Sequence, residues 1–411
     1  MNRQRIPSCL LRCLTGPPQL GFAFSLILAG LLAVTLSLPG RAAPGKHGNA
    51  ILLGQSCALT GPAGELGQNF RSGLLASFEA YNRSTGLSVR SIELISLDDR
   101  YEPELAIRNT RRLIANPEVF CLIGEVGTPT SKAVLPIIEE ASVPFIAPFT
   151  GAELLRQPFK PQVFNIRSSY AQELECLVGY LTEALNIQHI ACLYQNDAFG
   201  QNGLWGLKRA LAKRDMQLVS TGHYERNTVA VKNAFLSIRS GQPEAVVLIG
   251  AYRPCASFIS LARRHGLESA TFCTISFVGA ESLQKTLQGT ENGCIVSQVV
   301  PSPWQSRLPV IQEYRRDLER HQPGRDYGYV SLEGYLAGRF FIQAVQAIPG
   351  PLTRQGLIRT IEKRQTFDLG GLVLRFGPHD HQGLDRVYLS IIKDCCVQPL
   401  SSDPSLPPAP P

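Results

Sequence analysis

Hydroxyl-bearing residues and glycines gather in two segments of the chain, each directly after a short apolar run. Their hydroxyls and unhindered backbone N–H groups can hold a small polar molecule by hydrogen bonds, and helix N-termini beside them favour anionic groups. The sequence places no set of acid, base and nucleophile with them, so we expect the molecule to be bound and not converted. The residues are Gly127, Thr128, Thr130, Ser131, Thr150 and Gly151.

Two strands and a helix are predicted to position these segments. In a parallel sheet, both segments fall at the carboxyl ends of their strands, where open α/β sheets bind ligands. The two loops are therefore the predicted centre of a binding site. The expected elements are a strand at Val119–Ile123, a loop at Gly124–Ser131, a helix at Lys132–Ala141, a strand at Pro144–Ala147 and a loop at Pro148–Gly151.

The same alternation of strands and helices runs through most of the chain and predicts an α/β fold with doubly wound parallel sheets. A second cycle begins near Arg167, so two similar lobes are expected; two further helices and a Gly-rich β segment, Gly370–Ile392, follow them. The other expected strands are Ala50–Gln55, Ser91–Leu97, His189–Tyr194, Gln217–Tyr224, Ala245–Ile249, Thr271–Ile275 and Gly293–Val299. The other expected helices are Gln68–Asn82, Glu102–Ala115, Ala171–Leu185, Gln201–Arg214, Ala230–Ser240, Cys255–His265, Pro309–His321 and Tyr329–Ile348.

Three aromatic residues, Phe149, Phe199 and Tyr252, stand just beyond the carboxyl ends of expected strands. An aromatic side chain at such a place is exposed unless something covers it. If the two lobes close on one another, these three rings line the cleft between them. The alternative is that one or more of the rings packs against its own lobe.

A glycine-rich turn at Gly61–Gly67 follows a strand and opens a helix, which loosely resembles a dinucleotide-binding fingerprint. Its spacing is GxxGxxG instead of GxGxxG, and Pro62 stiffens the turn where a pyrophosphate would have to approach. We interpret the segment as a tight strand–helix turn and expect no cofactor.

The acidic and histidine residues do not indicate an enzyme or a metal site. Adjacent residues on a strand point to opposite faces, so Asp98 and Asp99 are expected to make loop hydrogen bonds and not to share acid–base chemistry. Asp197 is expected to cap the helix that follows it. The segment His379–His381 is expected to be a solvated turn and not a metal ligand set.

The first 43 residues have the order of a secretory signal peptide. Arginines precede an apolar run, Leu20–Leu38, and small residues follow it, with cleavage expected after Ala42 or Ala43. The alternative is an uncleaved membrane anchor, because the run is close to the ~20 residues that a membrane span needs. At the other end, the Ser/Pro-rich tail, residues 399–411, is expected to be disordered.

Charge and length exclude some classes of function. The chain of 411 residues carries a formal charge of +7, and removing residues 1–43 takes away four arginines and no acid, which leaves +3. That charge is mild and its basic residues are scattered, so nucleic-acid binding is not expected. The remaining part exceeds one ordinary domain, which favours two.

Nine cysteines follow the expected signal segment, an odd number, so at least one is not paired within the chain. Those inside apolar strands, Cys121, Cys192 and Cys294, are expected to be small buried hydrophobic residues. Cys57 and the adjacent pair Cys395–Cys396 are the better candidates for disulfides in an oxidising compartment.

Over residues 49–393, the order of several motifs resembles the periplasmic solute-binding proteins of branched-chain amino acid ABC importers. The resemblance implies a type I periplasmic-binding fold with two lobes joined by three crossings, closing on a ligand like a hinge. It implies lobe 1 at residues 48–166 plus 298–365 and lobe 2 at residues 167–297 plus 366–393. The motifs are ALTGPAGELGQ, LDDRYEP, IGEVGTPTSKAV, VPFIAP, YQNDAFG, GAYRPC, SQVVPSPW, SLEGYLAG and LGGLVLRFGPHDHQG.

The resemblance also implies a set of ligand contacts. Thr128 matches the hydroxyl residue that holds the ligand carboxylate in the amino acid binders, and Phe199 stands where those proteins carry a tyrosine. The remaining matched contacts are Phe149, Thr150, Gly151 and Tyr252.

One position departs from the family pattern. The acidic residue that pairs with the ligand ammonium falls at Ser276 and Phe277, and neither is acidic; Glu281 is several residues further on. Leaving a buried charge without its partner costs several kcal/mol. We therefore expect a small ligand with a carboxylate or amide and an apolar or aromatic body, with amino acids as the fallback.

These observations predict an exported solute-binding component of an ABC importer, working as a monomer with a membrane permease as its partner. The alternative is a ligand-sensing ectodomain retained by an uncleaved N-terminal anchor. An enzyme is the third hypothesis, and it lacks a nucleophile–base pair.

Overall fold

The computed structural model describes residues 50–85, 90–287 and 293–400. The expected signal peptide and most of the expected disordered tail lie outside these residues. Within the described ranges, no helix combines the length and the apolar character that crossing a bilayer requires.

The first sheet has five parallel strands in the order β2-β1-β3-β4-β5. It holds the two segments from which the binding site is predicted, because β3 and β4 precede them. The strands are β1 (Ala50–Cys57), β2 (Ser91–Asp98), β3 (Val119–Ile123), β4 (Phe145–Ile146) and β5 (Val163–Phe164).

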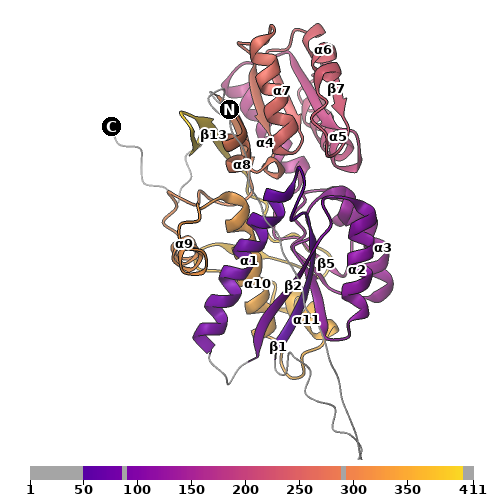
Figure 1. The fold of residues 1–411 in the computed structure, drawn as a ribbon, viewed down its shortest axis with the longest axis vertical. Coiled ribbons are helices and arrows are strands. Elements are labelled where there is room, and N and C mark those ends of the chain that lie inside the picture. Colours follow the sequence, from indigo (N-terminus) through magenta and orange to yellow (C-terminus); the bar gives the residue numbers. More distant parts are fainter. Residues whose placement is uncertain (1–49, 86–89, 288–292, 401–411) are drawn as a thin grey trace, which may run out of the picture. The chain divides into compact units, whose positions relative to one another are not determined.

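Helices cover both faces of this sheet (Figure 1). Successive strand residues point to opposite faces, so Leu52 and Leu122 pack with α2 and α3, whereas Leu53 and Cys121 join the core that contains α1 and α10. The helices are α1 (Gly64–Thr85), α2 (Pro103–Ala115), α3 (Thr128–Ala141) and α10 (Tyr329–Gln346).

The second sheet has seven strands in the order β14-β13-β10-β9-β8-β6-β7. The strands β6 to β10 are parallel, and β13 and β14 extend one edge in antiparallel pairing. They are β6 (Ile190–Gln195), β7 (Ser220–Tyr224), β8 (Ala245–Ile249), β9 (Thr271–Thr274), β10 (Cys294–Gln298), β13 (Tyr388–Lys393) and β14 (Cys396–Pro399). Its helices are α4 (Tyr170–Gly179), α5 (Ala198–Ala212), α6 (Lys232–Ser240), α7 (Tyr252–Arg264) and α8 (Ala280–Leu287).

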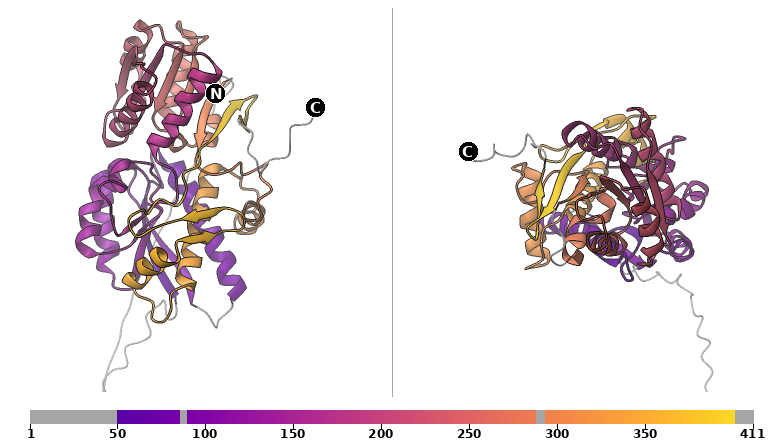
Figure 2. Two further views of the ribbon diagram at one scale, coloured as in Figure 1. Left: turned by 180° about the vertical axis from the view of Figure 1, so that it is seen from behind. Right: turned by 90° about the horizontal axis from the view of Figure 1, so that it is seen from above.

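The expected fold class is confirmed: two doubly wound α/β lobes, one on each sheet, with the chain crossing between them after β5, after β10 and before β13. Helices α9 (Pro309–His321) and α11 (Arg354–Arg364) follow the second crossing with α10. The ribbon places the hairpin β11 (Thr366–Asp368) and β12 (Val373–Arg375) on the lobe of the first sheet (Figure 2). The ring of Phe367 in β11 lies 5.1 Å from that of Phe340 on α10, although the predicted boundary at residue 366 assigns the hairpin to lobe 2.

Several helices begin earlier than the sequence predicted. Helix α3 begins at Thr128 instead of Lys132, α5 at Ala198 instead of Gln201, and α7 at Tyr252 instead of Cys255. Small and hydroxyl residues suggested loops, but they form first helical turns, where unpaired backbone N–H groups point outward. The loop expected at Gly124–Ser131 is therefore shorter, and Thr128 lies at the N-terminus of α3, whereas Thr150 and Gly151 lie outside the helices.

Other elements were not predicted. The short strand β5, helix α8 and helix α11 were missing from the expectation, and the helix expected to end at Leu185 ends at Gly179 and continues as a π turn, Tyr180–Ala184. The side chain of Thr353 accepts a hydrogen bond from the Gly356 N–H at the start of α11, so its N-cap was a signal that could have revealed it.

Two expectations about side chains are wrong. Cys57 is a buried thiol without a disulfide, because it ends the inner strand β1 inside the core, away from solvent. His381 is buried and not solvated: its ring stacks on Phe164 at 3.9 Å, its Nδ1 lies 3.0 Å from the Val163 carbonyl, and burial lowers its pKa to about 4. The expected burial of Cys121, Cys192 and Cys294 is confirmed.

Candidate functional site

The loop residues after β3 and β4 meet through their side chains. The hydroxyls of Thr128 and Thr150 lie 2.8 Å apart and both residues are buried. Thr130 instead bonds back to the carbonyls of Val126 and Gly127 within its own helical turn. The pair Thr128–Thr150 is thus the polar centre that lobe 1 contributes.

Gly151 allows the first turn of α4 to approach these hydroxyls. A Cβ at this position would lie 2.6 Å from the ring of Tyr170 and 2.7 Å from its backbone nitrogen. The Tyr170 N–H donates to the Gly151 carbonyl at 2.8 Å. A larger residue here would push the tyrosine ring away from the threonine pair.

Phe277 of lobe 2 is the centre of an aromatic cluster drawn from both lobes. Its ring centroid lies 5.5 Å from Phe149, 5.9 Å from Tyr101 and 4.6 Å from Phe199. Phe70 adds a further ring, 5.4 Å from Phe149. These separations are typical of favourable ring contacts, and all five rings are buried.

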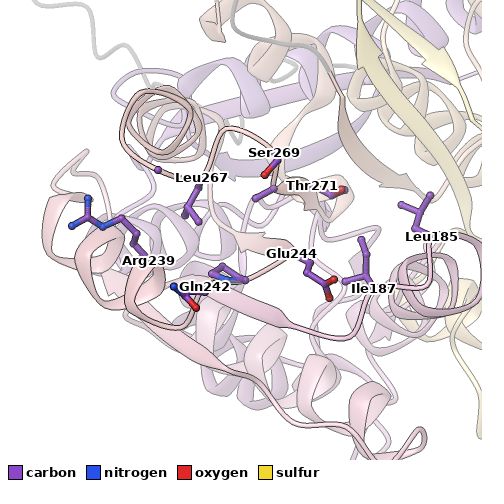
Figure 3. A pocket seen from close by; sticks show the side chains of 11 residues that line it. Leu185, Ile187, Arg239, Gln242, Glu244, Leu267, Ser269 and Thr271 are labelled. Carbon is purple, nitrogen blue, oxygen red and sulfur yellow. The ribbon is translucent and has the colours of Figure 1, made fainter.

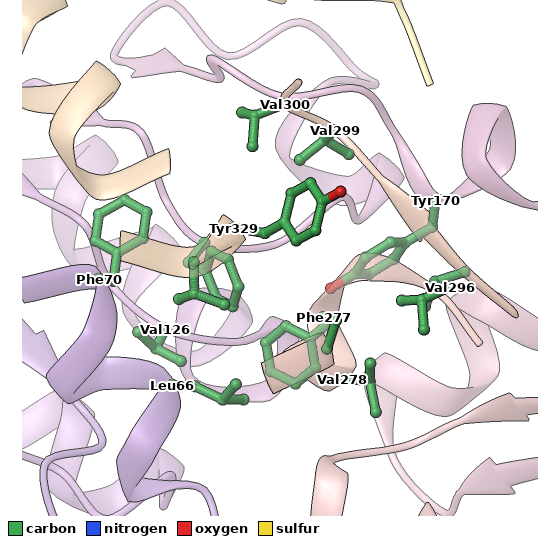
Figure 4. Packing of buried hydrophobic residues seen from close by; sticks show 14 of the residues in the cluster. Leu66, Phe70, Val126, Tyr170, Phe277, Val278, Val296, Val299, Val300 and Tyr329 are labelled. Atoms are coloured by element: carbon green, nitrogen blue, oxygen red, sulfur yellow. The ribbon is translucent and has the colours of Figure 1, made fainter. Parts of the chain in front are cut away.

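Apolar and hydroxyl groups surround the Phe277 ring (Figure 4). Tyr170 points its hydroxyl toward this ring, and Leu66 and Val126 lie on the ring's other side. The Tyr170 hydroxyl lies near Thr150, yet it makes no hydrogen bond of ordinary geometry with any described residue.

Tyr252 is buried but does not belong to the aromatic cluster around Phe277. Its side chain is 1% exposed, and its hydroxyl lies near Glu65 at the start of α1. Within the described part of the chain it has no ring contact with Phe149 or Phe199. The structure thus brings Phe149, Phe199 and Phe277 together and sets Tyr252 against lobe 1 at another point.

Ser276, where the family pattern has an acid, contacts a buried ion cluster that the sequence analysis missed. Its Oγ accepts a hydrogen bond from Nη2 of Arg167, and its N–H donates to Oε2 of Glu173 at 2.8 Å. Nη2 of Arg167 lies 3.2 Å from Oε1 of Glu173, and its Nη1 lies 3.6 Å from Oε1 of Glu333. In the sequence, Arg167 is an isolated charge shortly after an apolar strand, and this was the signal that could have indicated a buried charged group.

This cluster joins the lobes electrostatically. Glu333 lies on α10, whereas Glu173 lies on α4 and also accepts from Ser297 Oγ at 2.6 Å. Burial alone would lower the pKa of Arg167, but the charges of Glu333 and Glu173 together hold it above its ordinary value. Burial raises the pKa of Glu333 to about 7 against the opposing effect of the Arg167 charge.

Two further acids lie buried at the carboxyl edge of the first sheet. Burial raises the pKa of Asp99 to about 7, although Ser56 Oγ and the Tyr101 N–H donate to it. Burial, together with the Asp99 charge, raises the pKa of Glu125 well above its usual range.

The remaining acidic candidates serve the backbone as expected. Partial burial would raise the pKa of Asp98, but hydrogen bonds from the Thr60 hydroxyl and from the N–H groups of Leu59, Thr60 and Arg100 lower it. Asp197 caps α5 through the Phe199 N–H at 2.9 Å. Both interpretations as structural acids are confirmed.

A cavity of about 930 Å³ lies elsewhere (Figure 3). Its lining includes Ile187, Glu244 and Thr271, which stand at the amino ends of β6, β8 and β9. Ligands bind at the opposite, carboxyl ends of parallel strands, so this cavity is separate from the candidate site.

Comparison with known proteins identifies the family. The family model described as "Periplasmic binding protein" matches residues 50–395. The chain belongs to the periplasmic binding protein family. The Leu/Ile/Val-binding protein homolog 3 of Brucella melitensis is 23% identical over 213 residues, and the match spans 51% of this chain and 56% of that relative.

Solved structures agree with this membership. A possible leucine/isoleucine/valine-binding protein from Rhodopirellula baltica is 36% identical, with a TM-score of 0.83. The superposition covers 88% of this chain and 98% of the Rhodopirellula chain. A fatty acid ABC transporter substrate-binding protein from Thermomonospora curvata has a TM-score of 0.75 at 20% identity, covering 85% of this chain and 90% of its own, and shows the fold alone.

The family membership confirms the resemblance found in the sequence. Periplasmic binding proteins of this kind are ligand-binding components of ABC transporters and are solute binders, not enzymes. The chain is related to the binding proteins of branched-chain amino acid transporters.

Proposed function

We propose that this protein is the extracytoplasmic solute-binding component of an ABC importer. It captures a small polar ligand, amino acid-like or a carboxylate or amide, between its two lobes and delivers it to a membrane permease. The observation that carries the proposal is the meeting of Thr128, Thr150 and Phe149 of lobe 1 with Phe199 and Phe277 of lobe 2.

The proposed contacts combine two chemistries. The threonine hydroxyls and the helix N-termini beside them suit an anionic or amide oxygen, and the phenylalanine rings suit an apolar body. The full proposed set is Thr128, Phe149, Thr150, Gly151, Phe199, Tyr252, Ser276 and Phe277. Because one fold serves many ligands, the side chains and not the architecture choose among them.

A thermal-shift screen of the purified protein tests this function. The probes are leucine, valine, aromatic carboxylates, short-chain amides and urea. A ligand that binds only the folded state stabilises it by ~2.7 kcal/mol at a hundredfold excess over Kd. A shift with at least one probe supports solute capture, and no shift with any of them argues against the proposed function.

A further inference from the structure

Arg167 has more hydrogen-bond donors than the surrounding protein can use. A guanidinium has five N–H donors. Nη2 bonds Glu173 and Ser276, but within the described residues Nε and Nη1 have no hydrogen-bond partner, and the nearest carboxylate oxygen to Nη1 is 3.6 Å away on Glu333. Arg167 is 0% exposed, and buried polar groups without partners are rare in folded proteins.

The same guanidinium touches the proposed contact residues. Its Cζ lies 4.9 Å from the ring centroid of Phe149 and 5.8 Å from that of Tyr170, and its Nη2 reaches Ser276. A positive charge with unused donors therefore adjoins the aromatic cluster, at the position where the family pattern has an acid for an ammonium group.

No charge on this side of the site replaces that acid. The carboxylate oxygens of Glu173 already accept hydrogen bonds from Arg167, from the Ser297 hydroxyl, and from the N–H and hydroxyl of Ser276. Glu125 lies at the lobe 1 edge, where burial and the Asp99 charge raise its pKa and so disfavour its charged form.

We propose that Arg167 binds the anionic group of the ligand and that the ligand is an aromatic carboxylate without an amino group. This rests on the proposed function. The ring of such a ligand contacts the cluster of Phe149, Phe199 and Phe277, and the hydroxyls of Thr150 and Tyr170 adjoin its carboxylate.

Isothermal titration of the purified protein with phenylacetate, phenylacetamide, phenylalanine and leucine tests the ligand class. We expect phenylacetate to bind at least tenfold more tightly than phenylalanine. Tighter binding of leucine or phenylalanine overturns this inference and leaves the proposed function standing. Failure of all four, together with a negative screen for solutes, overturns both.

Arg167→Gln tests the residue, with Arg156→Gln as its matched control. Arg156 lies in the same charge cluster, but its three nitrogens bond to Gln382 and to the carbonyls of Ala152 and Arg167. We expect Arg167→Gln to weaken phenylacetate binding at least tenfold and phenylacetamide binding less than threefold, and Arg156→Gln to change both less than threefold. Equal losses for acid and amide, or equal losses in the two variants, contradict a direct contact.

Ser276→Glu gives a test that does not depend on the stability of the arginine variant. The new carboxylate would pair with Arg167 and restore the family's acid, so we expect the preference for phenylacetate over phenylalanine to fall at least tenfold. An unchanged preference in Ser276→Glu overturns the proposal.

Discussion

Tyr252 carries a buried hydroxyl without a hydrogen-bond partner among the described residues. Removing an unpartnered buried hydroxyl is close to neutral for folding. We expect Tyr252→Phe to change the free energy of unfolding by less than ~1 kcal/mol and to weaken ligand binding about tenfold, the size of one ligand hydrogen bond. Chemical denaturation and titration calorimetry measure the two effects.

Tyr314→Phe is the control for that variant. The Tyr314 hydroxyl accepts from the Gly328 N–H at 3.0 Å and lies 2.6 Å from Ser331 Oγ. Its loss should cost ~1 kcal/mol or more of stability and leave affinity unchanged. If Tyr252→Phe behaves like this control, Tyr252 does not contact the ligand.

Asp99 is expected to make stability depend on pH. Its pKa is raised to about 7 in the folded protein, against ~3.9 in an unfolded chain. The folded state therefore holds this proton more tightly, and the stabilisation present below ~pH 4 is lost as the pH rises through 7. Asp99→Asn should flatten the fall in unfolding free energy between pH 4 and 7 by up to ~1.4 kcal/mol per pH unit.

Urea denaturation at several pH values measures that slope. Glu333, whose pKa is also raised to about 7, contributes a similar fall that stays in the Asp99→Asn variant. An identical slope in wild type and variant would mean that Asp99 is ionised throughout, held by its bonds to Ser56 and the Tyr101 N–H.

At the scale of elements, the crossing of α1 and α10 depends on glycine. A Cβ at Gly73 would lie 1.8 Å from the Ser331 carbonyl oxygen, and one at Gly334 would lie 2.1 Å from the Phe70 carbonyl oxygen. Side chains at these two positions would force the helices apart. Because Phe70 belongs to the aromatic cluster, the crossing also sets the position of one wall of the candidate site.

Gly73→Ala tests this dependence. In an isolated helix, alanine is favoured over glycine by ~1 kcal/mol, but here overpacking should destabilise the protein by ~1–3 kcal/mol. Gly179→Ala, where the nearest atom is the flexible end of Arg214 at 3.1 Å, should be neutral or stabilising. Thermal denaturation compares the two; a stabilised Gly73→Ala would mean that the helices can separate at no cost.

At the scale of the whole molecule, a polar contact joins the lobes on surface loops. Nη2 of Arg226 lies 2.8 Å from Oε2 of Glu102, and the Asn227 amide donates to Oε1 of Glu102 at 2.7 Å and to the Arg100 carbonyl at 3.1 Å. These residues belong to opposite lobes. The contact stabilises the closed arrangement of the lobes. A ligand that binds between closed lobes is therefore held more tightly when the contact is present.

Glu102→Gln should therefore weaken ligand binding two- to fivefold, as expected for a partly exposed ion pair of ~0.5–1 kcal/mol. The loss should appear as faster ligand release in stopped-flow measurements. Asp326→Asn removes the exposed pair with Lys285, 3.0 Å apart, and should not change release. Equal release rates in Glu102→Gln and wild type would show that this contact does not stabilise the closed arrangement of the lobes.

The sequence by itself determined the fold class and the alternation of strands and helices, and it supplied Thr128 and Phe149 as proposed contacts. Apolar periodicity depends on neighbouring residues alone, and for this reason the bounds of β3, β8 and α9 were predicted correctly. Thr128 and Phe149 follow β3 and β4 in the chain, as expected. The roles of Asp98 and Asp197 also follow from bonds to near neighbours or an adjacent turn.

Only the tertiary structure decided which distant residues meet. Arg167 and Ser276 are 109 positions apart, and nothing local in the chain indicates that the arginine lies beside the serine. The same holds for Phe277, whose partners come from both lobes, and for His381, which sequence pattern placed in solvent. Burial, ring contacts and unused donors arise from the packing of whole elements, and that packing is not encoded in local periodicity.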